Sequence, residues 1–170
     1  MDRVIDHLRH EHQTILTAVD KAEAMADSGA LGATVSPASL QALRDFFTLY
    51  VHGLHQRKED STLFPWLRLK GVYEGAGCVG LLAAEHVDVA KAFPEDLSGA
   101  AWPAALQTYC SLLRNHIRRE DDVIFPLVLR LGTPQDAKEL LREFGAIDAS
   151  ATRAGLEDVL RAVDALAYAR

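Results

Sequence analysis

One short pattern of residues that can bind a metal occurs twice in this chain of 170 residues. The first copy spans residues 55–60 and begins with histidine, and the second copy spans residues 116–121. Each copy places a glutamate four residues after its histidine, a spacing that puts both side chains on one face of a helix. Each copy stands downstream of a Glu-His pair, Glu11-His12 or Glu85-His86. The sequence therefore indicates one metal half-site that is present twice.

The segments that must position these residues all have the apolar spacing of helices. The pattern predicts helices from the N-terminus to about residue 30, from Ser36 to about Lys70 with a bend before Pro65, from Leu82 to Phe93, and from Pro103 to Leu131. A fifth helix is predicted from Pro134 to Phe144 and a sixth from Ser150 onward.

The order of the motifs predicts the architecture. The first and third helices carry Glu-His, whereas the second and fourth carry the His-xxx-Glu pattern. We therefore expect an all-α protein, in which residues 1–132 form an antiparallel four-helix bundle of two pseudo-repeated hairpins. Residues 133–170 form a helical extension of one or two helices, which we expect to pack on the bundle or to mediate dimerisation.

Composition narrows the classes of partner and compartment. The net charge is −6, and no run of lysine or arginine is longer than two residues, so nucleic acid is not an expected partner. No stretch has the roughly 20 apolar residues of a membrane span, and the charged N-terminus does not resemble a secretory signal. We expect a cytoplasmic protein without a membrane partner, with Cys78 and Cys110 reduced.

Six residues form the predicted metal site. Burying four imidazoles and two carboxylates without a cation would be costly, whereas a pair of metal ions neutralises the charge. If both carboxylates bridge, each ion receives two nitrogen and two oxygen donors from the protein, and a solvent-derived bridge leaves one position open. This donor set inside a helical bundle favours two iron ions over manganese or zinc. The predicted ligands are His12, His55, Glu59, His86, His116 and Glu120.

Other polar residues near the motifs receive weaker predictions. His7 and His10 are expected to face solvent, and His52 is expected in the core or beside a ligand rather than on the metal. Glu11 and Glu85 are interpreted as ion-pairing residues or as hydrogen-bond partners of ligands. The remaining predictions are core positions for Tyr50 and Tyr109, solvated helix faces for Arg57-Lys58 and Arg118-Arg119, and helix-ending anchors for Phe64-Pro65 and Phe125-Pro126.

With these motifs in place, the chain resembles the hemerythrin-like family of HHE cation-binding domains over Leu8 to about Leu131. The resemblance implies a four-helix bundle with an oxo- or hydroxo-bridged diiron centre, four terminal histidine ligands, and Glu59 and Glu120 as bridges. Oxygen-carrying members have a fifth histidine where this chain has Ala90, and they ligate through an aspartate at the position of Asp121. This chain is more similar to the six-ligand branch that includes iron–sulfur-cluster repair proteins.

We therefore expect a protein that binds or reacts with a small oxidant, namely O₂, NO or peroxide, rather than a dedicated enzyme. The alternative hypothesis of an enzyme is a diiron oxidoreductase that disproportionates peroxide. A hypothesis from another functional class is iron donation or iron sensing, with an iron–sulfur protein as the partner that receives the iron. The sequence leaves a homodimer, the physiological ligand and the metal held in the cell open.

Overall fold

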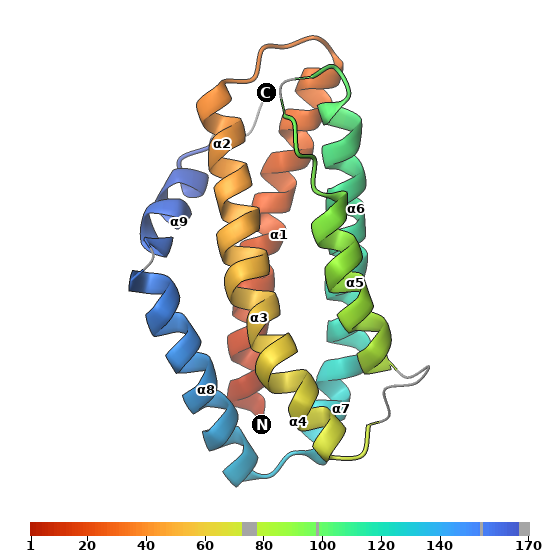
Figure 1. The fold of residues 1–170 in the computed structure, drawn as a ribbon, viewed down its shortest axis with the longest axis vertical. Helices are drawn as coiled ribbons and strands as arrows, with labels where there is room; N and C mark the ends of the chain where they lie inside the picture. Colours follow the sequence, from red (N-terminus) through yellow and green to blue (C-terminus); the bar gives the residue numbers. More distant parts are fainter. Residues whose placement is uncertain (73–77, 98, 154, 167–170) are drawn as a thin grey trace.

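The computed structural model describes residues 1–72, 78–97, 99–153 and 155–166, and all regular structure in these ranges is helical. Four rods form an up-and-down antiparallel bundle, which confirms the predicted fold class (Figure 1). The first rod is α1 (Asp2–Ala30), and the third is α5 (Cys78–Ala92). The second comprises α2 (Pro37–Asp45), η1 (Phe46–His55), α3 (Gln56–Lys58), η2 (Glu59–Leu63) and α4 (Phe64–Leu69); the fourth comprises α6 (Trp102–Arg119), η3 (Glu120–Ile124) and α7 (Phe125–Leu131).

Both rods that carry the repeated motif widen into π-helical turns at the motif. The segments η2 and η3 each begin at the motif glutamate and end just before Phe-Pro. Proline lacks an N–H group and clashes with the carbonyl four residues earlier, and a wider turn just before it makes room for the ring. Pro65 and Pro126 thus sit near the start of α4 and α7, which continue the rods. The prediction that Phe-Pro ends each helix was wrong.

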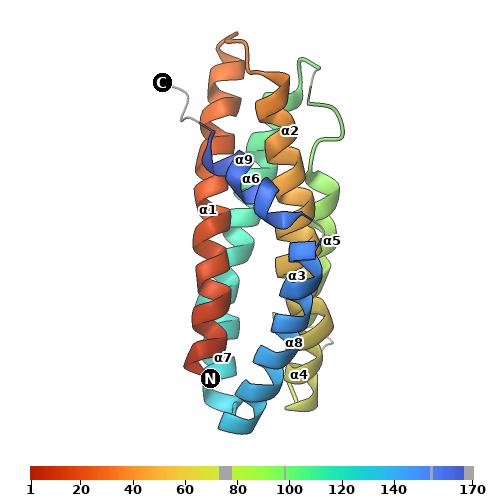
Figure 2. The same cartoon turned by 90° about the vertical axis from the view of Figure 1, so that its left-hand side faces the viewer.

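The C-terminal helices lie against one side of the bundle, along α1 and the second rod (Figures 1 and 2). They are α8 (Pro134–Arg153) and α9 (Leu156–Asp164). The predicted break between Phe144 and Ser150 was misplaced, because α8 continues through it and α9 begins after Gly155, whose φ of 87° favours glycine. The Nζ atom of Lys21 donates hydrogen bonds to the carbonyls of Val163 and Asp164 and so caps α9.

The core consists of two apolar clusters with a polar layer between them. On α1, Leu8 belongs to one cluster and Ile15 to the other, and His12 lies between them. The fourth rod repeats this arrangement, with Glu120 between Ile117 and Ile124. The bundle therefore encloses its polar layer above and below with apolar side chains.

Cys78 and Cys110 are free thiols. Among the described ranges, no helix has both the length and the apolar character needed to cross a membrane.

Candidate metal centre

The structure brings all six predicted ligands together in the polar layer. None of their side chains is substantially accessible to solvent: both glutamates are 0% exposed and the most exposed histidine, His86, is 3%. Their donor atoms form two groups of four, and within each group all donor atoms lie within 4.8 Å of one another. One group is His12, His55, Glu59 and Glu120, and the other is Glu59, His86, His116 and Glu120.

The two carboxylates belong to both groups. The Oε2 atom of Glu120 lies 3.2 Å from Nε2 of His12, whereas Oε1 lies 3.2 Å from Nε2 of His116. Glu120 thus directs one oxygen toward each group. The Oε2 atom of Glu59 lies 3.5 Å from Nε2 of His55 and 3.3 Å from Nε2 of His86. This arrangement suits two metal ions that share both carboxylates.

Each of the four histidines has a carboxylate beside its other ring nitrogen, Nδ1. His55 faces Glu11 at 2.8 Å, and His116 faces Glu85 at 3.1 Å, so each Glu-His pair supports the histidine of its own hairpin. The aspartate after each motif glutamate reaches the opposite hairpin: Asp60 lies 2.8 Å from His86, and Asp121 lies 3.4 Å from His12. A carboxylate at Nδ1 fixes the tautomer that presents Nε2 to a metal.

These four carboxylates explain more of the motif than the sequence alone indicated. Glu11 and Glu85 take both of their predicted roles, because each contacts a ligand histidine and also pairs with a cation, Lys58 or Arg119. Asp60 was given no role, and Asp121 was considered only as a ligand of the kind found in oxygen carriers. The signal was present in the sequence, because both aspartates recur at the same place in the repeat.

The phenylalanines of the repeated Phe-Pro pairs also contact ligands. Phe125 stacks on His12 with ring centroids 5.2 Å apart, and Phe64 stacks on His86 at 5.4 Å. In both cases the phenylalanine of one hairpin covers a histidine of the other. These rings exclude water from one side of the site and restrict rotation of the imidazoles.

Unpaired atoms show that the residues present fit a metal. Among the described residues, the buried side-chain atoms without a hydrogen-bond partner include both nitrogens of His12, Nε2 of His55 and all four carboxylate oxygens of Glu59 and Glu120. Buried polar atoms rarely remain unpaired in folded proteins. Metal ions would satisfy these atoms together.

The electrostatics of the cluster also favour a cation. Burial lowers the pKa of His12, but the adjacent carboxylates of Asp121 and Glu120 outweigh burial and raise the pKa to about 10. Burial also lowers the pKa of His86, but Asp60, Glu120 and Glu59 outweigh burial and raise this pKa to about 11. Burial raises the pKa of Glu120, but the adjacent imidazole of His116 more than offsets burial and holds this pKa well below its usual range.

A buried lysine extends the site toward the C-terminal helices, which contradicts the prediction of a solvated face at Arg57-Lys58. Lys58 is 0% exposed and forms ion pairs with Glu11 and with Asp148 of α8. Its Nζ atom also lies 2.9 Å from Nε2 of His7 and 5.9 Å from the ring centre of Phe144. The sequence could not indicate this contact because α8 follows the motif by many residues.

Arg119 is the matching cation of the second hairpin, and it is partly exposed, close to the solvated position predicted for it. Arg119 occupies the same place in the repeat as Lys58 and pairs with Glu85, but its side chain is 43% exposed. In each hairpin, therefore, a cation pairs with a glutamate, and that glutamate contacts Nδ1 of a ligand histidine; we call these three residues a series. The first series lies beneath α8, because Lys58 contacts Asp148 and Phe144 of that helix.

The other predicted residues lie outside both groups of donors. His7 is only 32% exposed, because it packs against the tilted ring of Phe144 and contacts Glu11, so its predicted solvent position was partly wrong. His10 is exposed, as predicted. Tyr50 and Tyr109 are buried in the core, also as predicted. Ala90, where oxygen carriers have a fifth histidine, is exposed.

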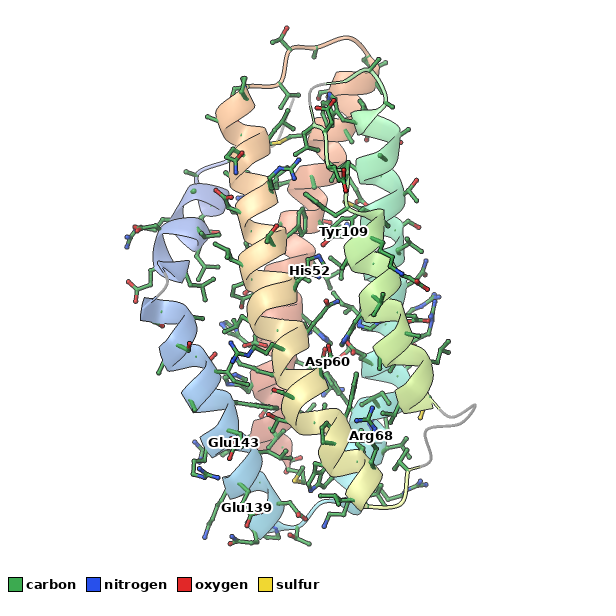
Figure 3. The ribbon with its side chains drawn as sticks, viewed as in Figure 1. His52, Asp60, Arg68, Tyr109, Glu139 and Glu143 are labelled. Atoms are coloured by element: carbon green, nitrogen blue, oxygen red, sulfur yellow. The ribbon has the colours of Figure 1, made fainter. Side chains whose placement is uncertain are left out.

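His52 is half-buried and lies outside both donor groups, in agreement with the prediction that it does not bind the metal. Its Nδ1 atom lies 2.7 Å from Oε1 of Gln56, and its Nε2 atom lies 3.2 Å from the hydroxyl of Tyr109. Figure 3 shows His52 and Tyr109 in the bundle interior, between the second rod and the helices α5 and α6, with Asp60 farther along the second rod. Burial is the main cause that lowers the pKa of His52.

Comparison with known proteins agrees with the fold and the donor set. Residues 3–128 match the family described as the hemerythrin HHE cation-binding domain. This match covers all six predicted ligands and ends before α8. No curated protein and no solved structure gives a significant match to the chain.

Proposed function

We propose, from the premise that this chain belongs to the hemerythrin family of HHE cation-binding domains, that its buried cluster holds two iron ions and binds or reduces a small oxidant. Membership makes it a metal-binding protein, with a cation that is usually iron. The six ligands would be His12, His55, Glu59, His86, His116 and Glu120. The iron pair would supply the electrons and the open coordination position for O₂, NO or peroxide.

One observation carries this proposal: in the described part of the chain, each group consists of four residues and shares two of them, Glu59 and Glu120, with the other group. Iron with nitrogen and oxygen ligands commonly takes five or six donors, so such a site retains room for an external ligand. Four protein donors would close the coordination of a structural zinc ion, so this argument applies to iron. With iron bound, the donor count favours chemistry at the metal over a purely structural role.

The same geometry favours retention of iron over its donation. Release of iron requires access to the ligands, yet all six are at most 3% exposed. Four carboxylates hold the Nδ1 atoms of the histidines, and both groups are complete. Iron sensing and donation to an iron–sulfur protein therefore rank second.

The residues around the metal pair have different roles. Glu59 and Glu120 neutralise positive charge between the two groups, and the four histidines provide neutral donors when Nδ1 donates to its carboxylate. Phe64 and Phe125 cover two of the imidazoles and keep water from them. Because an apolar cluster lies on each side of the polar layer, a small molecule inside the bundle would make its polar contacts in that layer.

Rapid mixing of the reduced, iron-loaded protein with NO or with hydrogen peroxide tests the function. We expect a nitrosyl absorption band with NO and fast oxidation by peroxide, each proportional to iron content. His10→Ala is the matched control, because His10 is exposed and lies outside both groups. Iron that is fully retained but reacts with neither NO nor peroxide would contradict an oxidant-binding role and favour sensing.

A further inference from the structure

The two hairpins repeat their ligands but differ beside them. Gln56 follows the ligand His55, whereas the matching residue after His116 is Ile117. His52 precedes His55 by three residues, whereas the matching residue before His116 is Leu113. Ile117 and Leu113 belong to the apolar core. The first hairpin therefore places a polar pair where the second has apolar packing.

This polar pair is held in one orientation by a chain of hydrogen bonds. The hydroxyl of Tyr109 can donate to Nε2 of His52 across 3.2 Å, and Nδ1 of His52 can donate to Oε1 of Gln56 across 2.7 Å. The lowered pKa of His52 is consistent with a neutral ring that has one donor and one acceptor. Since Oε1 of Gln56 is occupied, its amide nitrogen must find another partner.

That amide nitrogen has no partner among the described residues. Gln56 is 4% exposed, and its Nε2 atom is buried without a hydrogen bond. The other buried atoms of this kind, in the described part of the chain, belong to four of the proposed ligands and to Asp121. An unpaired buried donor costs roughly as much as a lost hydrogen bond. Because Gln56 directly follows the ligand His55 in the chain, we look for its acceptor in a molecule bound at the metal pair rather than in the protein.

We infer that Gln56 is the residue that recognises the small molecule bound at the metal pair, by donating an N–H from Nε2 to an acceptor atom of that molecule. His52 and Tyr109 are positioning residues that hold the amide. The preferred ligands are then small molecules that carry a negative charge or an acceptor lone pair. This inference rests on the proposed function and concerns the donor group that contains His12 and His55.

Azide provides a direct probe, because its binding to the oxidised protein can be followed by ligand-to-metal charge transfer. Gln56→Leu should weaken azide binding by about tenfold to hundredfold, the effect of losing a hydrogen bond to a charged acceptor. His52→Leu, which copies Leu113 of the second hairpin, should weaken it by a smaller factor because the amide remains but is no longer held. Ile117→Leu is the matched control and should leave azide affinity within about twofold.

A second measurement uses the unaltered protein. If Nε2 of Gln56 donates to the bound ligand, the vibrational frequency of bound azide should shift between H₂O and D₂O. The absence of a shift in the unaltered protein, or equal azide affinity in iron-loaded Gln56→Leu, would overturn the inference. Failure of the unaltered protein to load iron would instead overturn the proposed function. The shift should vanish in iron-loaded Gln56→Leu, because a shift that persists there would come from another exchangeable donor.

Discussion

The Nε2 atoms of His86 and His116 lie 2.9 Å apart. Two nitrogen donors at about 2.1 Å from one metal ion, at right angles to each other, would be separated by about 3 Å. The other histidine pair is arranged similarly, since the ring planes of His12 and His55 cross at 68° and those of His86 and His116 at 65°. The fold thus places each histidine pair where it can bind one ion.

Glu120→Ala should release both metal ions, because its two oxygens face different groups. The loss in affinity should exceed the tenfold to hundredfold expected for Asp121→Asn, which removes only a partner of His12. Metal analysis of both purified variants checks this. An empty site in Asp121→Asn together with a full site in Glu120→Ala would establish the ligand arrangement of the oxygen carriers instead.

Asp60→Asn should lower iron affinity by about tenfold to hundredfold, because it weakens the contact that orients His86 from the opposite hairpin. Asp122→Asn provides the control, since Asp122 is an exposed neighbour of the second motif and contacts neither donor group. Competition with a chromophoric chelator measures both affinities. Equal affinities for the two variants would mean that the carboxylate beside His86 does not support metal binding.

The fold was predictable because each helix carries a local signal, the apolar spacing of its inward face. The six residues of the candidate site were predictable for a related reason, since the motif occurs twice and the i, i+4 spacing puts His55 and Glu59 on one face. Lys58 was not predictable, because α8 covers it and no local pattern indicates which helix face α8 will occupy. The role of Gln56 depends on a hydrogen bond to His52 that only the widened turns of the second rod define.

Lys58→Met should destabilise the protein by about 3–5 kcal/mol, because Glu11 and Asp148 would lose a cation that is fully buried. Arg119→Met, at the matching place in the other hairpin, should cost less than about 1 kcal/mol because Arg119 is partly exposed. Denaturant unfolding of the metal-free variants provides both values. Equal costs would show that cover by α8 does not distinguish the two cations.

Metal binding at neutral pH should release about two protons from the histidines. The pKa values of His12 and His86 are raised to about 10 and about 11, so both imidazoles carry a proton at pH 7.5 that a metal must displace. Lowering the pH should therefore strip the metal, because protons compete more strongly. Calorimetry of metal binding in buffers with different ionisation enthalpies counts the protons. A count of zero would contradict raised pKa values at these two residues.

The most direct test of the central claim is anomalous X-ray scattering at the iron edge from crystals of protein purified without added metal. The account predicts two iron peaks per chain, about 3–4 Å apart, between the two histidine pairs and both bounded by Glu59 and Glu120. Metal analysis of the same preparation should give close to two irons per chain. A single peak, or zinc in place of iron, would contradict the proposed diiron centre.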